Sequence, residues 1–198
     1  MNQSLRSGAV ALLVSALSGA IACRGNTQTS SAPAPVAEPA PRPPSPNPAP
    51  TTPGRADLLA VDSAGKIATL TLETTSGNGA PSALIGGSRN GETRIVVPLG
   101  WTVKWNWRNA DAGGSHSLVV MVQREKIPLE GGRPSLANAM SRMIAEGLPP
   151  GQTDQTAFVA EEAGWYWLMC GVPSHALAGE WIEFRVDPEA RTARVTQK

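Results

Sequence analysis

The stretch that decides the fold is Trp165-Tyr-Trp-Leu-Met-Cys-Gly-Val-Pro-Ser-His-Ala-Leu-Ala-Gly-Glu-Trp181. Trp165 and Trp167 alternate with other side chains as far as Cys170, which predicts a β-strand. Gly and Pro follow directly and predict that the strand ends in a loop. The run therefore places one thiol, at Cys170, and one imidazole, at His175, on a strand-to-loop turn.

A second histidine, His116, lies upstream in Gly114-Ser-His-Ser-Leu-Val-Val120. The chain has 2 His and 2 Cys, and three of those four residues are His116, Cys170 and His175. Taken singly, a strand cysteine is a small buried hydrophobe and a histidine is a satisfied polar residue. Taken together, two imidazoles and one thiolate are the ligands of a mononuclear copper electron-transfer site.

The part of the chain from residue 57 to residue 198 predicts one all-β domain. Short alternating runs are separated by Gly, Pro and Asn, as in β-sandwiches and barrels. Val103, Trp105 and Trp107 share one face of the clearest run, which favours core positions for both tryptophans over sugar stacking. Eight strands are expected, near Ile67–Glu73, Ser82–Gly86, Thr93–Val97, Thr102–Trp107, Ser117–Val122, Thr153–Val159, Trp165–Cys170 and Glu180–Val186.

One segment breaks the β pattern. Between Ser135 and Glu146 apolar residues recur at helical spacing, and Ser135 is suited to an N-cap. A short amphipathic helix is therefore predicted in the insertion after the His116 strand. Met140 and Met143 fall on its apolar face, which favours packing over copper handling.

The first 56 residues predict export and tethering. Residues 1–22 have the basic, apolar and small-residue pattern of a signal peptide, and the apolar part is too short to span a membrane comfortably. Ala20-Ile-Ala-Cys23 resembles a lipobox, and acylation of Cys23 would anchor the chain to a membrane; the alternative is a soluble exported protein. Residues 23–56 are rich in Pro and predict a disordered linker, either a tether or a plain spacer.

Composition and motifs exclude several classes of function. The net charge is +1 and no stretch clusters Lys or Arg, so no nucleic acid is expected as a partner. Ser115 and His116 are neighbours on a strand and face opposite sides, which argues against a hydrolase pair. The loop has only Cys170, which excludes a binuclear copper site, and the absence of His-x-His pairs excludes a multicopper oxidase.

The chain resembles the cupredoxins, the blue-copper family, and within them it is most similar to sulfocyanin. The resemblance implies a Greek-key β-sandwich that holds one copper ion, Cu(I) or Cu(II), through His116, Cys170 and His175, with a weak axial ligand. The resemblance covers most of the chain after the linker. Three runs carry it: Gly91-Glu-Thr-Arg-Ile-Val-Val-Pro-Leu-Gly-Trp-Thr-Val103, Ser115-His-Ser-Leu-Val119 and Trp165 to Trp181.

Glu180 stands where the family carries its axial methionine, five residues after the second histidine. Three interpretations stay open: Glu180 binds copper, it turns to solvent, or the site has lost copper. Met169 is no substitute, because it neighbours Cys170 in the strand and points to the opposite face. A carboxylate ligand would favour Cu(II) and lower the reduction potential. Backbone groups next to the cysteine, at Gly171 and Val172, are expected to hydrogen-bond the sulfur.

The resemblance implies an electron carrier that passes single electrons between redox proteins such as cytochromes or a terminal oxidase, and the signal pattern and lipobox place it, tethered, in the periplasm. The first alternative is a red-copper-like protein that binds or transforms a small molecule at an open copper position. The second alternative is copper delivery or storage, which usually employs exposed Met or His clusters. The chain lacks such clusters, so electron transfer without enzymatic turnover is the leading interpretation.

Overall fold

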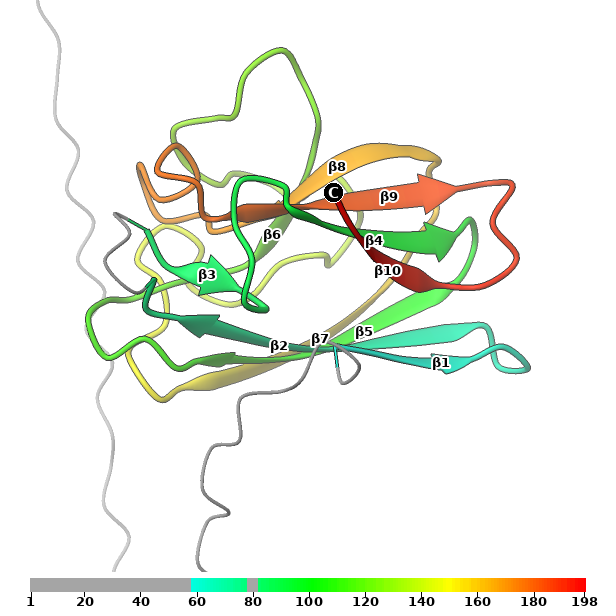
Figure 1. The fold of residues 1–198 in the computed structure, drawn as a ribbon, viewed down its shortest axis with the longest axis horizontal. Helices are drawn as coiled ribbons and strands as arrows, with labels where there is room; N and C mark the ends of the chain where they lie inside the picture. Colours follow the sequence, from blue (N-terminus) through cyan, green and yellow to red (C-terminus); the bar gives the residue numbers. More distant parts are fainter. Residues whose placement is uncertain (1–57, 78–81) are drawn as a thin grey trace, which may run out of the picture. The chain divides into compact units, whose positions relative to one another are not determined.

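The structure, a computed structural model, describes residues 58–77 and 82–198. These residues form two layers of β-sheet (Figure 1), and they contain no helix, hence none that is long and apolar enough to cross a membrane. The predicted all-β sandwich is confirmed, but the described residues contain ten strands where eight were predicted. The expected signal peptide, the linker and the lipidation site at Cys23 lie outside the described residues.

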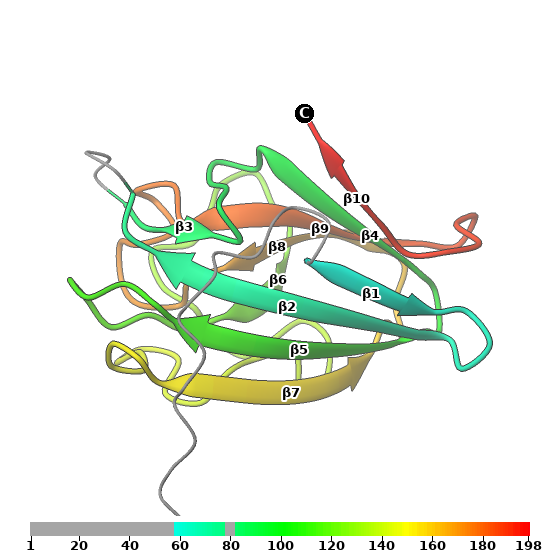
Figure 2. The same ribbon diagram turned by 60° about the horizontal axis from the view of Figure 1, so that its bottom comes forward.

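The first sheet has five strands and lies at the front of Figure 2. Strand β2 pairs in parallel with β5 through the register Leu70↔Trp105, and the other pairs of this sheet are antiparallel. Its strands, in the order β1-β2-β5-β7 with β3 also on β2, are β1 (Leu59–Asp62), β2 (Ile67–Thr75), β3 (Leu84–Ile85), β5 (Thr102–Asn109) and β7 (Thr153–Val159).

The second sheet also has five strands and supplies most of the candidate site. Strand β4 pairs in parallel with β9, and the remaining pairs are antiparallel. Its strands, in the order β10-β4-β9-β8-β6, are β10 (Arg194–Gln197), β4 (Thr93–Pro98), β9 (Trp181–Asp187), β8 (Gly164–Met169) and β6 (Val119–Val122).

The two strands that the sequence did not predict, β1 and β10, are both edge strands. Three of the four residues of β1 are exposed, and no residue of β10 is fully buried. Both strands bury little of their surface, so they lack the alternation of apolar and polar residues that marks a strand with one face in the core. Hydrophobic periodicity is therefore a poor detector of such strands.

The main core lies between the two sheets. Trp105 and Trp107 are each 1% exposed, which confirms their predicted core positions. The ring of Trp105 meets Phe158 edge-on with centroids 5.6 Å apart, and Trp107 donates through Nε1 to Thr74 Oγ1 at 3.1 Å. Full burial of a large apolar side chain contributes about 1.5–3 kcal/mol, so these residues anchor the sandwich under the site.

The segment from Ser135 to Glu146 is not a helix, so the helix prediction is wrong. Asn138 and Met143 have φ angles of 64° and 52°, and a left-handed residue cannot continue a right-handed helix. The Ser135 hydroxyl is no N-cap either, because it accepts a hydrogen bond from the backbone N–H of Val122 in β6 at 2.7 Å.

This segment instead covers the free edge of β6. The Val120 N–H donates to Ala139 O at 2.9 Å, and the Ser141 N–H donates to Leu118 O at 2.8 Å. Leu136 and Ala139 are buried, as the apolar pattern suggested, but Met140 and Met143 are exposed and do not pack. The backbone of this segment therefore forms hydrogen bonds with the open edge of β6 instead of the hydrogen bonds of a helix.

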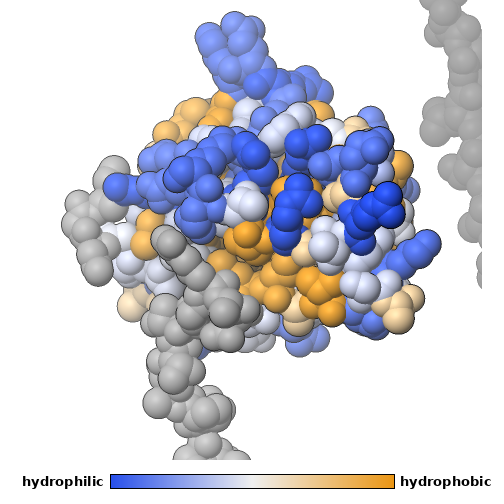
Figure 3. All heavy atoms as spheres, turned by 45° about the vertical axis from the view of Figure 1, so that its right-hand side comes forward, coloured by the Kyte–Doolittle hydropathy of each residue, from blue (hydrophilic) through white to orange (hydrophobic). Residues whose placement is uncertain are grey.

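The two ends of the sandwich differ in character. Cys170 follows β8 at one end. Leu99 lies in the connection from β4 to β5 at the other end, where Val159 of β7 is the register partner of Thr102 at the start of β5. Figure 3 brings that second end forward and shows apolar side chains in its lower part beneath a hydrophilic upper part. Leu99 and Val159 are among the exposed large hydrophobic residues.

Candidate metal centre

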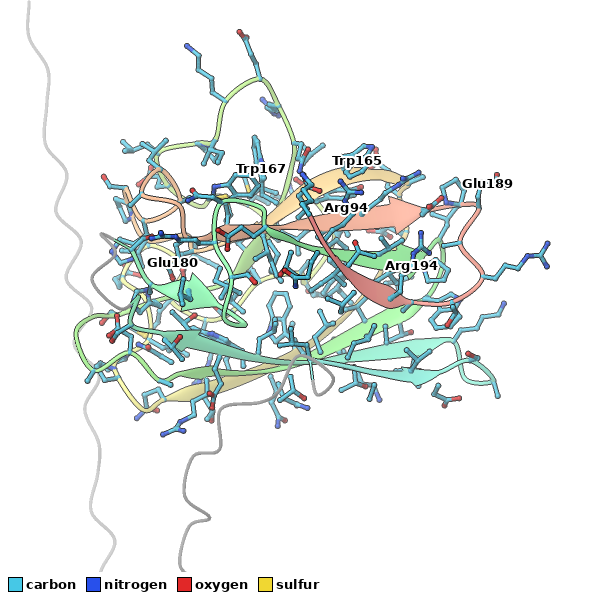
Figure 4. All side chains as sticks on the ribbon, in the orientation of Figure 1. Arg94, Trp165, Trp167, Glu180, Glu189 and Arg194 are labelled. Carbon is cyan, nitrogen blue, oxygen red and sulfur yellow. The ribbon has the colours of Figure 1, made fainter. Side chains whose placement is uncertain are left out.

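The residues predicted as ligands converge at one end of the second sheet. Cys170 directly follows β8, Glu180 directly precedes β9, His175 lies in the loop between them, and His116 lies before β6. One ligand atom from each residue lies within 4.8 Å of those of the other three, so the group could hold a metal ion. Figure 4 shows Glu180 at this end of the molecule.

Both histidines turn Nδ1 toward the centre of the group. His116 Nδ1 lies 2.8 Å from Glu180 Oε1, and His175 Nδ1 lies 3.2 Å from Glu180 Oε2. The Cys170 sulfur lies 3.9 Å from His116 Nδ1 and 3.5 Å from His175 Nδ1. Bonds of roughly 2.0–2.3 Å to one first-row metal place neighbouring ligand atoms about 3–4 Å apart. The separations fit a single ion.

Glu180 lies inside the group and does not turn to solvent. Its side chain is 1% exposed, and its two oxygens lie beside Nδ1 of His116 and Nδ1 of His175. A buried carboxylate is costly unless a cation or hydrogen-bond donors compensate its charge. The two imidazoles provide that compensation when they are protonated, and a metal ion among these residues would provide it in their place.

Backbone hydrogen bonds close the loop that carries three of the four residues. The Cys170 N–H donates to Glu180 O at 3.1 Å, and the Glu180 N–H donates to His175 O at 3.1 Å. Met169, just before the loop, packs with Trp167 in a small cluster on the outer face of the second sheet, as its predicted direction requires. The loop is therefore built on the sheet and held at both ends.

The backbone of Gly147 and Leu148 packs closely against the backbone of His116 and holds it in position. It exchanges two backbone hydrogen bonds with Leu148, at 3.2 Å and 2.6 Å. Gly147, next to Leu148, has a φ of +74°, and a Cβ atom there would lie 2.7 Å from the backbone nitrogen of His116. The residue at 147 must therefore be a glycine for His116 to keep its position.

Ser117 links the two halves of the site. Its N–H points at the Cys170 sulfur at 3.4 Å, and its hydroxyl accepts from the Gly171 N–H at 2.9 Å and donates to Ile144 O at 2.7 Å. The sulfur bond expected from Gly171 and Val172 thus comes from the neighbour of His116 instead. Such contacts to a thiolate tune its donor strength.

Asp111 is a site residue that the sequence analysis missed. Its Oδ2 lies 2.9 Å from His116 Nε2, the ring nitrogen that faces away from the group. Asp111 Oδ1 accepts hydrogen bonds from the Ser76 hydroxyl at 2.5 Å and the Gly113 N–H at 2.8 Å. A carboxylate behind a ligand histidine is a recurrent arrangement at metal sites. The sequence feature that could have indicated this contact is an acidic residue five positions before His116, with Gly113 and Gly114 between them to allow a turn.

Interactions among the four residues raise the pKa values of the two histidines and lower those of Cys170 and Glu180. Burial lowers the pKa of His116, but its interactions with Cys170 and Glu180 outweigh burial and raise the pKa to about 10. Interactions with Cys170 and Glu180 raise the pKa of His175 to about 9. Burial raises the pKa of Cys170 and of Glu180, yet the two histidines bring both below their usual values. The two imidazoles therefore hold protons that a metal ion would replace.

A family model described as the sulfocyanin (SoxE) domain matches residues 54–193. The chain belongs to the sulfocyanin family. This family consists of cupredoxins, so the chain is a copper electron-transfer protein, and the donor set of the site fits one copper ion. Comparison with curated protein sequences gives no match.

Solved structures similar to this sulfocyanin-family chain include rusticyanins and an auracyanin. A rusticyanin from Thiobacillus ferrooxidans is 23% identical over 66% of this chain and 87% of its own, with a TM-score of 0.41. A reduced rusticyanin is 19% identical over 62% and 85% of the two chains, with a TM-score of 0.44. Reduced auracyanin from Roseiflexus castenholzii is 21% identical over 60% and 97%, with a TM-score of 0.41.

Proposed function

We propose that the protein holds one copper ion through His116, Cys170, His175 and Glu180 and carries single electrons between redox proteins. The observation that carries this proposal is the convergence of the four donor atoms, with both Nδ1 atoms turned inward. Soft sulfur suits Cu(I), imidazole suits both oxidation states, and the carboxylate favours Cu(II). Bound copper would supply the one-electron redox change.

The residues of the chain keep the donor positions fixed during that change. Cys170 and Glu180 are joined through the backbone, and Ser117 ties the Cys170 side to the His116 side. A donor set held by a sheet rearranges little when an electron arrives, which lowers the reorganisation energy. Rapid exchange depends on that small rearrangement, and no proton or ligand has to move.

The edge of His175 is the proposed contact point for redox partners such as a cytochrome or a terminal oxidase. The side chain of His175 is 33% exposed, whereas His116 is buried. Leu177, two residues later, is exposed, and so is Leu129, whose carbonyl accepts the Ser174 N–H at 2.7 Å. An apolar rim around a ligand histidine suits transient docking, because it brings the partner close without strong binding.

Optical and electron paramagnetic resonance spectra of the copper-loaded protein test this proposal. We expect an intense thiolate-to-copper charge-transfer band and one copper ion per chain. Cys170→Ser should abolish the band, and Met169→Leu, which removes the neighbouring sulfur, should retain it. Copper that binds without such a band, or a band that survives Cys170→Ser, would contradict the proposed site.

The proposed location is the periplasm, with a lipid anchor at Cys23. The support comes from the sequence: the signal pattern over residues 1–22, the lipobox-like Ala20-Ile-Ala-Cys23 and the Pro-rich linker. Mass spectrometry of the mature amino terminus should find a diacylglyceryl cysteine. An unmodified Cys23, or a chain that retains residues 1–22, would contradict the anchor.

A cleft beside the site supports a second candidate function, the binding of a small molecule at copper. The cleft has a volume of about 280 Å³, and its lining includes His116, His175, Glu180 and Ser82. The Ser82 hydroxyl is buried without a hydrogen-bond partner among the described residues. Azide or nitric oxide should leave the charge-transfer band unchanged if the protein is only a carrier. A shift of the band that Ser82→Ala weakens would favour the second function.

A further inference from the structure

Strand β8 connects the candidate copper site with a partly exposed tryptophan. Cys170 directly follows the strand, and Trp165, Trp167 and Met169 alternate along it on the outer face of the second sheet. Figure 4 shows Trp165 and Trp167 on that outer side. Trp167 and Met169 are buried, whereas Trp165 is 38% exposed. The row of side chains is therefore buried next to Cys170 and becomes exposed at Trp165.

The strand is also a continuous bonded path. Cys170 and Trp165 are five positions apart, and a strand rises about 3.3 Å per residue, which makes the path roughly 16 Å long. Electron tunnelling decays exponentially with distance, and it is faster through covalent bonds and packed atoms than through gaps. The cluster of Trp167 and Met169 with Val119 and Ala176 keeps the outer side of the path packed near the site.

Two arginines frame the exposed tryptophan. The guanidinium carbon of Arg94 lies 4.6 Å from the ring centroid of Trp165, and that of Arg185 lies 4.7 Å from it. Arg185 is the register partner of Trp165 on β9. Both distances are within the range of cation–π attraction, so the ring is held in place next to two positive charges.

On the same face of the second sheet, the basic side chains are partly exposed to solvent and their acidic partners are buried. Arg94, Arg185 and Lys198 are partly exposed, whereas their ion-pair partners Glu183 and Asp187 are buried. Arg194, on edge strand β10, adds a further exposed cation. The charged residues Glu92, Glu189 and Arg191 lie in connections between strands, and Glu161 and Glu162 lie in the connection before β8. The charged side chains that contact the ring of Trp165 from strands β4 and β9 are therefore cations.

We infer that this face is a second electron port, where a redox protein docks with a carboxylate-bearing surface over Trp165. With copper held by the site residues, β8 would carry one electron to the oxidised partner; the change from Cu(I) to Cu(II) would supply that electron, and the partner would be reduced by one electron. The inference rests on the electron-carrier function proposed above. Trp165 and the His175 edge lie at different places on the molecule, so a donor and an acceptor can be bound at the same time.

Stopped-flow oxidation of the Cu(I) protein by hexacyanoferrate(III) tests the port kinetically. Arg94→Gln with Arg185→Gln should slow the second-order reaction about tenfold at low ionic strength, because two attracting charges are lost. The charge-retaining pair Arg94→Lys with Arg185→Lys should keep most of the rate. Lys104→Gln with Arg108→Gln removes the same charge from β5 in the other sheet, and the rate should change only slightly.

Binding of the redox-inert anion hexacyanocobaltate(III) provides a readout that needs no electron transfer. We expect it to shift the indole N–H resonance of Trp165, which Trp165→Phe assigns, in the full chain with or without copper. Loss of that shift in the Arg94→Gln and Arg185→Gln protein supports the port. The inference is overturned if Trp165 does not respond to the anion, or if the β5 control pair slows oxidation equally. Failure of the copper protein to exchange electrons at all would instead refute the proposed function.

Discussion

Glu180 Oε1 lies 2.8 Å from Nδ1 of His116 in the interior of the protein. The same carboxylate reaches Nδ1 of His175 through its second oxygen, at 3.2 Å. A carboxylate with a purely structural role would need only one histidine as its ion-pair partner. It would not need the Cys170 sulfur near the same two imidazoles. Here the two imidazoles, the sulfur and the carboxylate face one point, as co-ligands of an ion do.

Replacing Glu180 with Met should raise the reduction potential of the copper protein. The carboxylate is a hard, charged donor that favours Cu(II), and a thioether lacks the charge and favours Cu(I). The thiolate charge-transfer band should move at the same time, because a weaker axial donor strengthens the copper–sulfur bond. Redox titration and the optical spectrum measure both effects.

Glu180→Gln is the matched control for this prediction, since it keeps the shape of the side chain and removes its charge. We expect its potential to lie between those of the parent and Glu180→Met. A potential and a spectrum equal to those of the parent in both variants would show that Glu180 does not bind copper.

Replacing Asp111 with Asn should weaken copper binding by about 10–100-fold, as the loss of a carboxylate behind a ligand histidine typically does. Asp111 Oδ2 lies 2.9 Å from His116 Nε2 and holds the ring so that Nδ1 faces the site. The potential should also rise, because a negative charge near Cu(II) is removed. Competition with a chelator gives the affinity. Ser76→Ala, which removes only a donor to Asp111, should have a smaller effect in the same direction.

Replacing Gly147 with Ala should destabilise the protein and disturb the copper spectrum. A Cβ at this position meets the backbone of His116, and the φ of +74° is unfavourable for alanine. The two effects together cost about 2–5 kcal/mol. Gly151 has a φ of +80° but nothing near its Cβ, so Gly151→Ala should cost only about 1 kcal/mol and leave the spectrum intact. Equal losses in the two variants on chemical denaturation would mean that the contact with His116 is unimportant.

The convergence of His116, Cys170 and His175 could be predicted from the sequence because few residues can perform the chemistry, whereas the sequence left open whether Glu180 joins them or turns to solvent. The chain has 2 His and 2 Cys, and a family pattern relates three of those residues to one loop and one strand. Asp111 could not be predicted in the same way. Its contact with His116 depends on the path of the turn through Gly113 and Gly114, and aspartate is also common in turns for its own hydrogen bonds.

The wrong helix at Ser135–Glu146 has a different cause. Helical spacing of apolar residues is a local property, whereas the open edge of β6 is created by strand pairing elsewhere in the chain. The backbone bonds to Leu118 and Val120 satisfy that edge, and left-handed residues at Asn138 and Met143 allow the segment to follow it. The spacing of apolar residues within this segment cannot indicate that a neighbouring strand has an unpaired edge.

Copper binding should release protons and grow stronger as the pH rises. His116 and His175 have pKa values of about 10 and about 9, so near neutral pH both imidazoles carry a proton that copper must displace. The affinity should therefore increase by about tenfold per pH unit for each proton displaced, up to those pKa values. Chelator competition at several pH values measures the slope, and a pH indicator in weak buffer measures the released protons.

The same raised pKa values set the pH dependence of the copper-free protein. A histidine whose pKa is higher in the folded state than in the unfolded state, where it is about 6.5, stabilises the fold below the unfolded value. The contribution of each histidine declines as the pH rises from about 6.5 to its folded pKa, about 9 for His175 and about 10 for His116, so the free energy of unfolding should fall over that interval. Glu180→Gln removes the charge that both imidazoles face, so both pH dependences should weaken in this variant. A copper affinity that does not vary with pH in the parent protein would contradict the paired arrangement of imidazoles, thiolate and carboxylate.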